Sequence, residues 1–104
     1  HILFAVRQGR VLGTCALIPH GNNAAEVTKM AVAPEAQGQK LGQRLLQAII
    51  DRGRSLGVSQ LWLETNSQLK PAIHVYEKAG FQHVPPDPDS LYQRADVRMI
   101  MHLC

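Results

Sequence analysis

The chain has 104 residues, of which 45% are hydrophobic, 18% charged and 5% aromatic, with a formal net charge of +3. This composition favours one globular domain with an aliphatic core, which we expect to span residues 1–104. No apolar run approaches the roughly 20 residues that a membrane span needs, and no export signal opens the chain. Lys and Arg are scattered rather than gathered in a stripe, so we expect neither a membrane nor a nucleic-acid partner.

The cysteines and histidines show no spacing that is typical of a metal site or a disulfide framework. Cys15 lies in an apolar segment, and Cys104 is the last residue. The sequence contains no CxxC pair and no HExxH motif. We therefore expect no metal site and reduced cysteines, and the latter are typical of a cytoplasmic protein.

The first third of the chain predicts three antiparallel strands. Ile2–Arg7 and Val11–Ile18 are apolar segments on either side of a turn at Gly9, a pattern that is typical of a hairpin. Residues 19–23 form a second cluster of turn-forming residues, and Ala25–Val32 contains strand-favouring valines. Together these segments indicate a three-stranded meander.

The middle of the chain changes to helical periodicity. Apolar residues at helical spacing predict one helix with a single apolar face, formed by Leu41, Leu45, Leu46, Ile49, Ile50 and Leu56. Gly57 is placed to end this helix as its C-terminal cap. The next apolar segment, Leu61–Thr65, predicts a strand, so the helix is the crossover of a βαβ unit. We expect this strand to run parallel to Ala25–Val32.

The last third predicts a second helix and two more strands. Pro71 suits the first turn of a helix that Gly80 ends, and Phe81 begins a short strand. A proline-rich loop at residues 85–89 separates it from a final strand, Val97–Leu103. The expected order is β-β-β-α-β-α-β-β, an α/β fold with a mixed sheet. An exposed final strand would provide an edge for a homodimer.

The loop Gln37–Gly42, between a strand and the long helix, has the features of an anion site. Backbone N–H groups at a helix start lack internal partners, and the helix dipole adds partial positive charge, so a phosphate fits there. Gly38 and Gly42 would let a phosphate approach the backbone, and Lys40 adds a cation. Alone, this pattern also fits an ordinary turn. It is neither a Walker loop nor a dinucleotide fingerprint.

Two motifs resemble those of the GNAT superfamily of N-acetyltransferases. Val27–Leu46 contains a V-A-P turn followed by Q-G-Q-K-L-G at a helix start, which is similar to the family's coenzyme A-binding signature. Leu63–Asn66 and Ala72–Phe81, the second reading A-I-H-V-Y-E-K-A-G-F, are similar to the family's next strand and helix. The resemblance covers the chain from about Val11 to its end.

The resemblance implies a GNAT-like fold, in which an antiparallel meander joins a βαβ unit and the two central parallel strands splay into a V. It implies acetyl-CoA as co-substrate, no metal, and a bacterial-type N-acetyltransferase. Such an enzyme transfers the acetyl group to a primary amine of a small molecule or amino acid derivative, by direct attack on the thioester. A protein or peptide N-acetyltransferase and a catalytically inactive acyl-CoA-binding module remain the alternatives.

The chain departs from the family pattern in two places. Lys40 occupies the position of the usual middle glycine of the loop, where either its Cβ would weaken the backbone contact to a phosphate or its ammonium group would replace part of that contact. The family's first strand and first two helices have no counterpart before His1. These elements commonly help to form the acceptor pocket. Either residues are missing from this chain, or a partner subunit completes the acceptor side.

The resemblance assigns the proton transfers to Glu26 and Tyr76. Glu26 lies at the start of the strand that faces the thioester, and we expect it to deprotonate the amine, directly or through water. Otherwise it is a solvent-facing strand carboxylate. Tyr76 matches a tyrosine that protonates the departing thiolate; otherwise it packs in the core beside Phe81. Arg94, like Glu26, is expected on the acceptor side, where it binds a carboxylate or forms a surface ion pair.

The remaining expected contacts are to the coenzyme. The backbone of Met30–Val32 would bind the oxyanion and the pantetheine amides. Asn66 matches an asparagine that contacts the pantetheine arm, or else it caps the helix ahead. Lys78 approaches the phosphates, or else it is solvated. The expected coenzyme-binding residues are Met30, Ala31, Val32, Gln37, Gly38, Gln39, Lys40, Leu41, Gly42, Gln43, Asn66, Tyr76 and Lys78.

Overall fold

The computed structural model describes residues 1–37, 40–86 and 95–103, which form a six-stranded sheet and two α-helices. The elements are β1 (Ile2–Arg7), β2 (Arg10–Pro19), β3 (Ala24–Val32), a 3-10 turn (Pro34–Ala36), α1 (Leu41–Ser55), β4 (Gln60–Thr65), α2 (Lys70–Ala79), β5 (Gln82–Val84) and β6 (Val97–His102). The predicted order is confirmed, with the 3-10 turn added between β3 and α1. The fold is the expected α/β class with a mixed sheet.

The first three strands form the predicted antiparallel meander. Gln8 and Gly9 both have positive φ, 52° and 78°, which is the conformation of the type I′ turn that suits the twist of a hairpin. A register shift between Thr14 and Ala16 sets one extra residue of β3 against β2, and Lys29 has a φ of 56° at this place. Such a bulge bends a strand and increases its twist, so β3 changes direction here.

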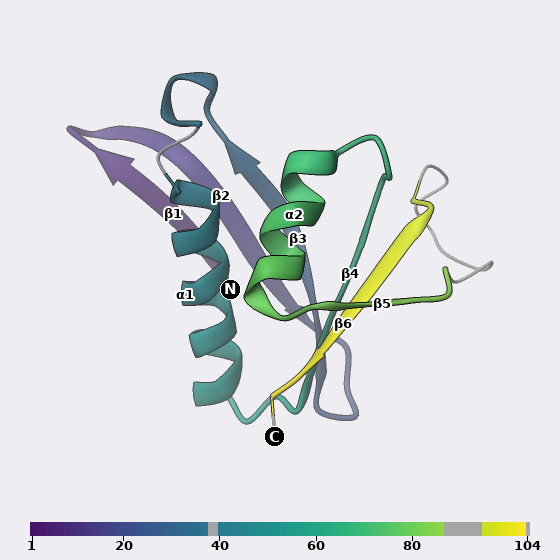
Figure 1. Cartoon of the computed structure of the whole chain (residues 1–104). Helices are drawn as coiled ribbons and strands as arrows, with labels where there is room; N and C mark the ends of the chain where they lie inside the picture. The colour runs from purple at the N-terminus through teal and green to yellow at the C-terminus, as the bar shows by residue number, and fades with distance from the viewer. Residues whose placement is uncertain (38–39, 87–94, 104) are drawn as a thin grey trace.

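Strands β3 and β4 run parallel, as predicted, but they pair over a short length. Their register joins Ala24–Glu26 to Gln60–Trp62, and β3 has no register partner on β4 beyond Glu26. Figure 1 shows the two strands close together at one end and diverging toward the other. Because α1 connects the two strands, the predicted βαβ unit is confirmed. Their divergence confirms the predicted V-shaped splay.

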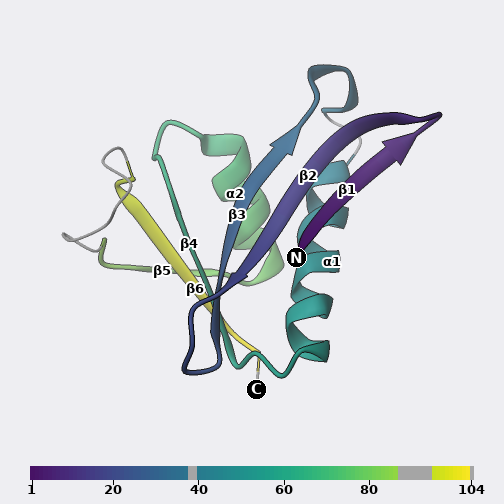
Figure 2. The ribbon, with the colours of Figure 1, turned by 180° about the vertical axis from the view of Figure 1, so that it is seen from behind.

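Both helices lie on one face of the sheet, and Figure 2 shows the opposite face without a helix over it in the described part of the chain. The core lies between the sheet and the helices. Its most deeply buried side chains are Cys15, Leu17, Leu46, Ile49, Ile50, Leu61, Leu63 and Met99. Neither described helix is both long and apolar enough to cross a membrane.

The uncovered face of the sheet carries the side chains that alternate with the core residues. Glu26 and Trp62 belong to it, because their chain neighbours Ala25, Val27 and Leu61 are buried in the core. Several large apolar side chains are between 38% and 60% exposed on strands β1 and β2: Ile2, Phe4, Val6, Val11 and Ile18.

The apolar face of α1 is confirmed except at its last predicted member. Its four central members are at most 6% exposed, whereas Leu56 is 44% exposed. Leu56 is the C-cap residue of α1, and Gly57, with a φ of 78°, turns the chain away from the helix axis. The periodic face therefore ends with the helix itself, at the cap that the glycine predicts.

The expectation of an exposed final strand is wrong. Strand β6 lies between β4 and β5 and pairs antiparallel with both, so its backbone is hydrogen-bonded on each side. The sheet ends instead at β1 and at the three-residue strand β5. Phe81 is buried just before β5, which begins at Gln82. The edge that we expected to serve a homodimer is therefore absent at β6.

Candidate functional site

A cleft of about 580 Å³ lies where β3 separates from β4, with α1 and α2 at its sides. It is lined by Met30, Ala31, Val32, Ala36, Gln37, Lys40, Leu41, Gly42, Gln43, Leu69, Pro71, Ala72, Val75 and Tyr76. The structure thus brings the end of β3, the loop and the tyrosine of α2 to one place. Five lining residues escaped the sequence analysis: Ala36, Leu69, Pro71, Ala72 and Val75. The spacing of Ala72, Val75 and Tyr76 along one helix face is the signal that could have found Ala72 and Val75.

The start of α1 forms one end of the cleft. Lys40 precedes the first helical residue in the left-handed conformation, with φ 60° and ψ 20°, and α1 has no side-chain cap. The N–H groups of its first turn therefore lack a capping acceptor from the described residues. A Cβ at Gly42 would meet only Val32 Cγ2, at 3.8 Å, so this part of the helix faces open space. Gly38 and Gln39 lie outside the described residues.

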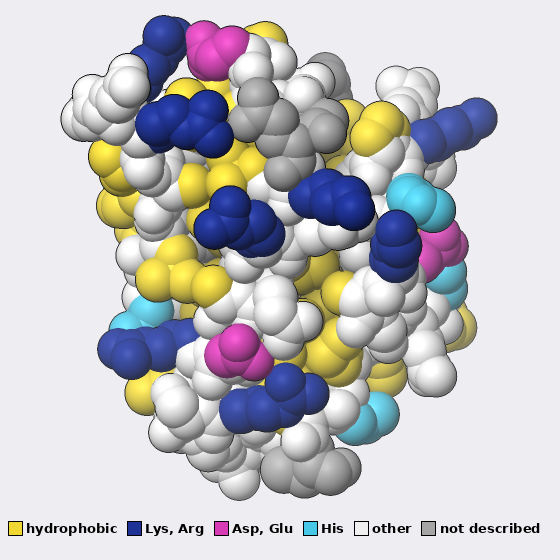
Figure 3. Space-filling model, turned by 60° about the vertical axis from the view of Figure 1, so that its left-hand side comes forward, with side chains coloured by type: hydrophobic (Ala, Val, Ile, Leu, Met, Phe, Trp, Pro, Cys, Tyr) yellow, Lys and Arg dark blue, Asp and Glu magenta, His cyan; other side chains and the backbone are white. Residues whose placement is uncertain are grey.

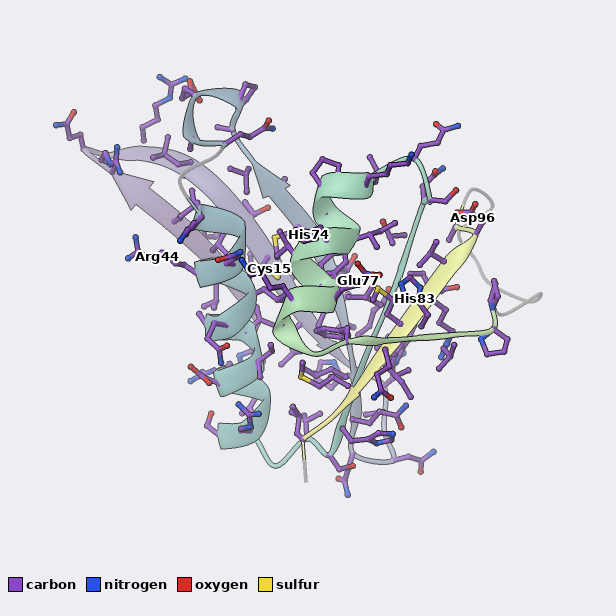
Figure 4. The ribbon with its side chains drawn as sticks, viewed as in Figure 1. Cys15, Arg44, His74, Glu77, His83 and Asp96 are labelled. Carbon is purple, nitrogen blue, oxygen red and sulfur yellow. The ribbon has the colours of Figure 1, made fainter. Side chains whose placement is uncertain are left out.

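Tyr76 brings a weakly acidic phenol to the cleft, and it is also part of the core. Its side chain is buried and meets Phe81 edge-on, with ring centroids 6.1 Å apart. Burial, with a smaller contribution from Cys15, raises the pKa of Tyr76 to about 12. Burial also raises the pKa of Cys15 to about 12, and Figure 4 shows this thiol between the two helices. Tyr76 therefore stays protonated across the neutral range. Its ring packs in the core, and the same residue lines the cleft.

Glu26 does not line the cleft, and the alternative of a solvent-facing carboxylate is wrong. Its side chain is 5% exposed, and its Oε1 lies 3.0 Å from Nε2 of His20. The His20 ring in turn meets Trp62, with centroids 5.1 Å apart, and Arg98 lies 4.5 Å from the centre of the Trp62 ring. The sequence analysis did not single out His20. Its signal was its place in the turn just before Glu26.

The other expected contacts lie elsewhere. Asn66 Oδ1 accepts the Gln68 N–H at 2.8 Å, a local turn rather than a cleft contact. Asp96 accepts both the N–H and the hydroxyl of Ser67, at 2.7 and 2.6 Å, which ties this loop to β6 and lowers the pKa of Asp96. Lys78 is exposed on α2. Arg94 lies outside the described residues, as does part of the proline-rich loop, residues 87–89.

Charge on the face that carries α1 is mainly positive. Figure 3 shows Lys and Arg side chains spread over this face, with few acidic side chains among them. Arg44, Arg52 and Arg54 are exposed on α1 itself. On the other helix, Glu77 of α2 and His83 of β5 pair at 2.8 Å, and Figure 4 shows them side by side. A mildly positive face favours the approach of an anionic ligand.

The family of this chain follows from its similarity to a known family model. The model of the acetyltransferase (GNAT) family matches residues 1–81. The chain belongs to this GNAT family. The match includes β3, the loop before α1, and all of α2, which are the elements that bound the cleft.

Curated relatives of this GNAT chain include enzymes with different acceptors in their names. It is 39% identical over 97 residues to the IAA acetyltransferase of Azospirillum brasilense, covering 86% of this chain and 63% of that protein. It is 33% identical over 81 residues to the ribosomal protein bS18-alanine N-acetyltransferase of Escherichia coli, covering 78% of this chain and 55% of that protein. The chain therefore spans less than two thirds of the length of these relatives.

Solved structures share the fold of the GNAT chain. A GNAT-family acetyltransferase from Staphylococcus aureus superposes with a TM-score of 0.91 at 21% identity, covering 99% of this chain and 68% of that one. A structure from Salmonella typhimurium, solved with its cofactor acetyl-CoA, has a TM-score of 0.82 at 23% identity, covering 99% and 64%. Within residues 1–37, 40–86 and 95–103 of the GNAT chain, no group of three His, Cys, Asp or Glu side chains could hold a metal ion.

Proposed function

We propose that this GNAT chain binds acetyl-CoA in the cleft and transfers the acetyl group to a primary amine of a small molecule or amino acid derivative. The observation that carries the proposal is the meeting of three parts in one cleft: the end of β3 beyond its pairing with β4, the start of α1, and Tyr76. Its volume of about 580 Å³ lies within the range of about 300–1,000 Å³ that is typical of small-molecule sites. When bound, acetyl-CoA supplies the acetyl group as an activated thioester.

The start of α1 is the proposed diphosphate site. Its uncapped N–H groups and the helix dipole favour an anion, and the open space at Gly42 lets a phosphate reach the backbone. Lys40 adds a side-chain charge where the family has a glycine. Gly38 and Gln39 are proposed to contribute as well. Asn66 and Lys78 stay predictions without support from the cleft, because neither lines it.

The end of β3 is the proposed oxyanion and pantetheine site. Beyond Glu26, this strand has no partner on β4, so Met30–Val32 can offer backbone groups to a ligand that lies in the splay. A preorganised N–H donor aimed at a developing oxyanion is worth about 2.7–4 kcal/mol in the transition state. The bulge at Lys29 turns Met30 and Val32 toward the core and the cleft.

Two side chains would handle the protons. Tyr76, whose pKa burial raises to about 12, holds its proton at neutral pH and can donate it to the leaving thiolate. Because a free thiol has a pKa near 8.5, the transfer requires good alignment. Glu26 would accept the proton of the amine from the uncovered face of the sheet. Arg94 remains a proposed acceptor contact on the same side.

The acceptor is the open part of the proposal. An N-terminal amine of a protein is a second acceptor class, because the uncovered face of the sheet lies open beside Glu26 and the relatives include a protein-acetylating enzyme. An inactive coenzyme-binding module is the third reading. A reducing, cytoplasmic location is also proposed, since Cys15 is a buried free thiol.

Thiol release from acetyl-CoA tests the proposal. The purified chain would be mixed with acetyl-CoA and a panel of small amines, amino acid derivatives and a peptide with an N-terminal alanine. We expect amine-dependent thiol release with at least one small amine. Release with the peptide alone would favour the protein acceptor. Coenzyme binding, seen as a raised melting temperature, without release from any acceptor would leave the inactive module.

A further inference from the structure

The base that the proposed function requires is enclosed. The Glu26 carboxylate is 5% exposed at the point where β3 and β4 separate, between Ile18 of β2 and its register partner Trp62. A carboxylate that takes a proton from an amine in each turnover must release that proton before the next one. Enclosure of this kind slows direct exchange with water. A second group that reaches both the carboxylate and the solvent would remove this obstacle.

His20 meets both requirements. Its Nε2 lies 3.0 Å from Glu26 Oε1, while its side chain is 43% exposed, so the ring connects the enclosed carboxylate to water. Local structure holds it there. The His20 N–H donates to the carbonyl oxygen of Ala24 at 2.9 Å, across a turn in which Gly21, Asn22 and Asn23 all have positive φ. The turn therefore fixes the ring beside the strand that carries Glu26.

Aromatic packing fixes the ring from the other side. The rings of His20 and Trp62 are 5.1 Å apart and inclined at 50°, and Arg98 lies against the Trp62 ring at 4.5 Å. Among the described residues of β4 and β6, the charged and titratable groups on the same face as Glu26 and Trp62 are Arg98 and His102 of β6 and Glu64 of β4. Arg98 lies against the Trp62 ring, and Glu64 is the register partner of Arg98. His102 lies at the far end of β6.

We propose that His20 is the proton exit of Glu26. The amine nitrogen forms its bond to the acetyl carbon, the thioester C–S bond breaks with Tyr76 protonating the leaving thiolate, and the nitrogen passes its own proton to the Glu26 carboxylate. Glu26 then passes a proton to the lone pair of His20 Nε2, and His20 releases its Nδ1 proton to water. The carboxylate and a neutral imidazole are restored, with the imidazole in its other tautomer, which solvent exchange resets. This inference rests on the proposed role of Glu26 as the base.

Buffer dependence of turnover tests the relay. In dilute buffer, we expect His20→Ala to lower kcat by an amount on the order of 10²-fold and to regain much of it as imidazole is added, because imidazole in solution replaces the missing ring. The wild-type chain and the matched control His102→Ala should show no response to imidazole. The affinity for acetyl-CoA should be equal in all three, since His20 does not line the cleft.

Two results would overturn the relay. One is a His20→Ala chain that keeps the wild-type kcat in dilute buffer. The other is a loss of kcat in His20→Ala that added imidazole does not reverse, together with a wild-type kcat in His20→Gln. That result would make His20 a positioning residue only. Failure of the proposed function would be visible separately, as a wild-type chain that releases no thiol with any acceptor. Nitrogen NMR of the His20 ring needs no turnover: ring signals that are identical in the wild type and Glu26→Gln would remove the pair itself.

Discussion

Glu26 and Trp62 are the last register partners of the parallel pair β3–β4, and the two strands separate beyond them. Both side chains point to the face of the sheet that carries no helix in the described residues. Tyr76 and the start of α1 lie on the opposite face, at the cleft. In the proposed reaction, the acid and the coenzyme therefore work from one side of the splay, and the base works from the other.

Glu26→Gln should lower kcat strongly without weakening the binding of the coenzyme. The amide keeps the shape of the carboxylate but cannot take the proton of the amine, so we expect a loss on the order of 10²-fold or more. Steady-state thiol release gives kcat, and calorimetry gives the affinity for acetyl-CoA. Glu64→Gln on the same face is the matched control and should keep kcat. A Glu26→Gln chain with unchanged rates at both low and high pH would remove the base role.

Tyr76→Phe should separate the proton-donating role of this side chain from its packing role. The ring and its contact with Phe81 are kept, so we expect near-wild-type stability and coenzyme affinity. Turnover should fall because the proton for the thiolate is gone. Tyr76→Ala should lose both turnover and about 3 kcal/mol or more of the free energy of unfolding, measured in urea. Full activity in the Phe variant would rule out the acid role.

The free energy of unfolding should fall with rising pH in the alkaline range. Cys15 and Tyr76 have pKa values of about 12 in the folded chain, against ordinary values of 9.0 and 10.0. The unfolded chain therefore loses these protons first. Stability is complete below about pH 9 and falls as the pH approaches 12, by about 1.4 kcal/mol per pH unit for each group.

Urea unfolding between pH 8 and pH 11 measures this slope. The Cys15→Ala variant should show no decline until about pH 10, where Tyr76 begins to ionise in the unfolded chain. Its absolute stability will differ because a buried side chain is shortened, so the comparison uses slopes only. A slope that is the same in the wild type and the variant between pH 9 and pH 10 would contradict the burial of the Cys15 thiol.

Lys40→Gly and Lys40→Ala should separate backbone strain from charge. Lys40 has a φ of 60°, a conformation that costs a side-chain-bearing residue about 1–2 kcal/mol. The glycine variant should therefore be more stable than the alanine variant by about 1 kcal/mol. Both lack the ammonium group, so both should bind acetyl-CoA about 2- to 5-fold more weakly than the wild type. Wild-type affinity in both variants would show that the loop relies on its backbone alone.

Gly42→Ala and Gly13→Ala should act in opposite directions on stability. A methyl group at Gly42 meets only Val32 at 3.8 Å, so the chain should gain up to about 1 kcal/mol of helix stability while the methyl group obstructs the coenzyme. A methyl group at Gly13 would lie 2.7 Å from Leu45 Cδ1 and 3.1 Å from the carbonyl oxygen of Ala31. That variant should lose about 1–3 kcal/mol. Thermal melts and calorimetry distinguish the two; equal coenzyme affinity in Gly42→Ala and wild type would place the coenzyme elsewhere.

The elements could be predicted from the sequence because their signals are local. Helical spacing and turn residues each lie within a few residues, and the helices and turns were found where the sequence indicated. The coenzyme role of the Gln37–Gly42 loop stays a prediction. The exposure of Leu56 was misjudged, because this residue continues the apolar spacing of α1 but lies at its C-cap, where Gly57 turns the chain away from the helix axis. Ala72 and Val75 lay within a recognised motif, but their face toward the cleft depends on how α2 packs.

The order of the elements and the family resemblance could both be predicted from the residues alone. Three further features became visible only in the folded chain: β6 lies inside the sheet, Glu26 is enclosed at the vertex of the splay, and the half-exposed His20 ring contacts it. These features depend on which strands pair and in what register. Pairing joins segments such as β3, β4 and β6 that lie far apart along the chain, and hydrogen bonds between them leave no local pattern in the residues.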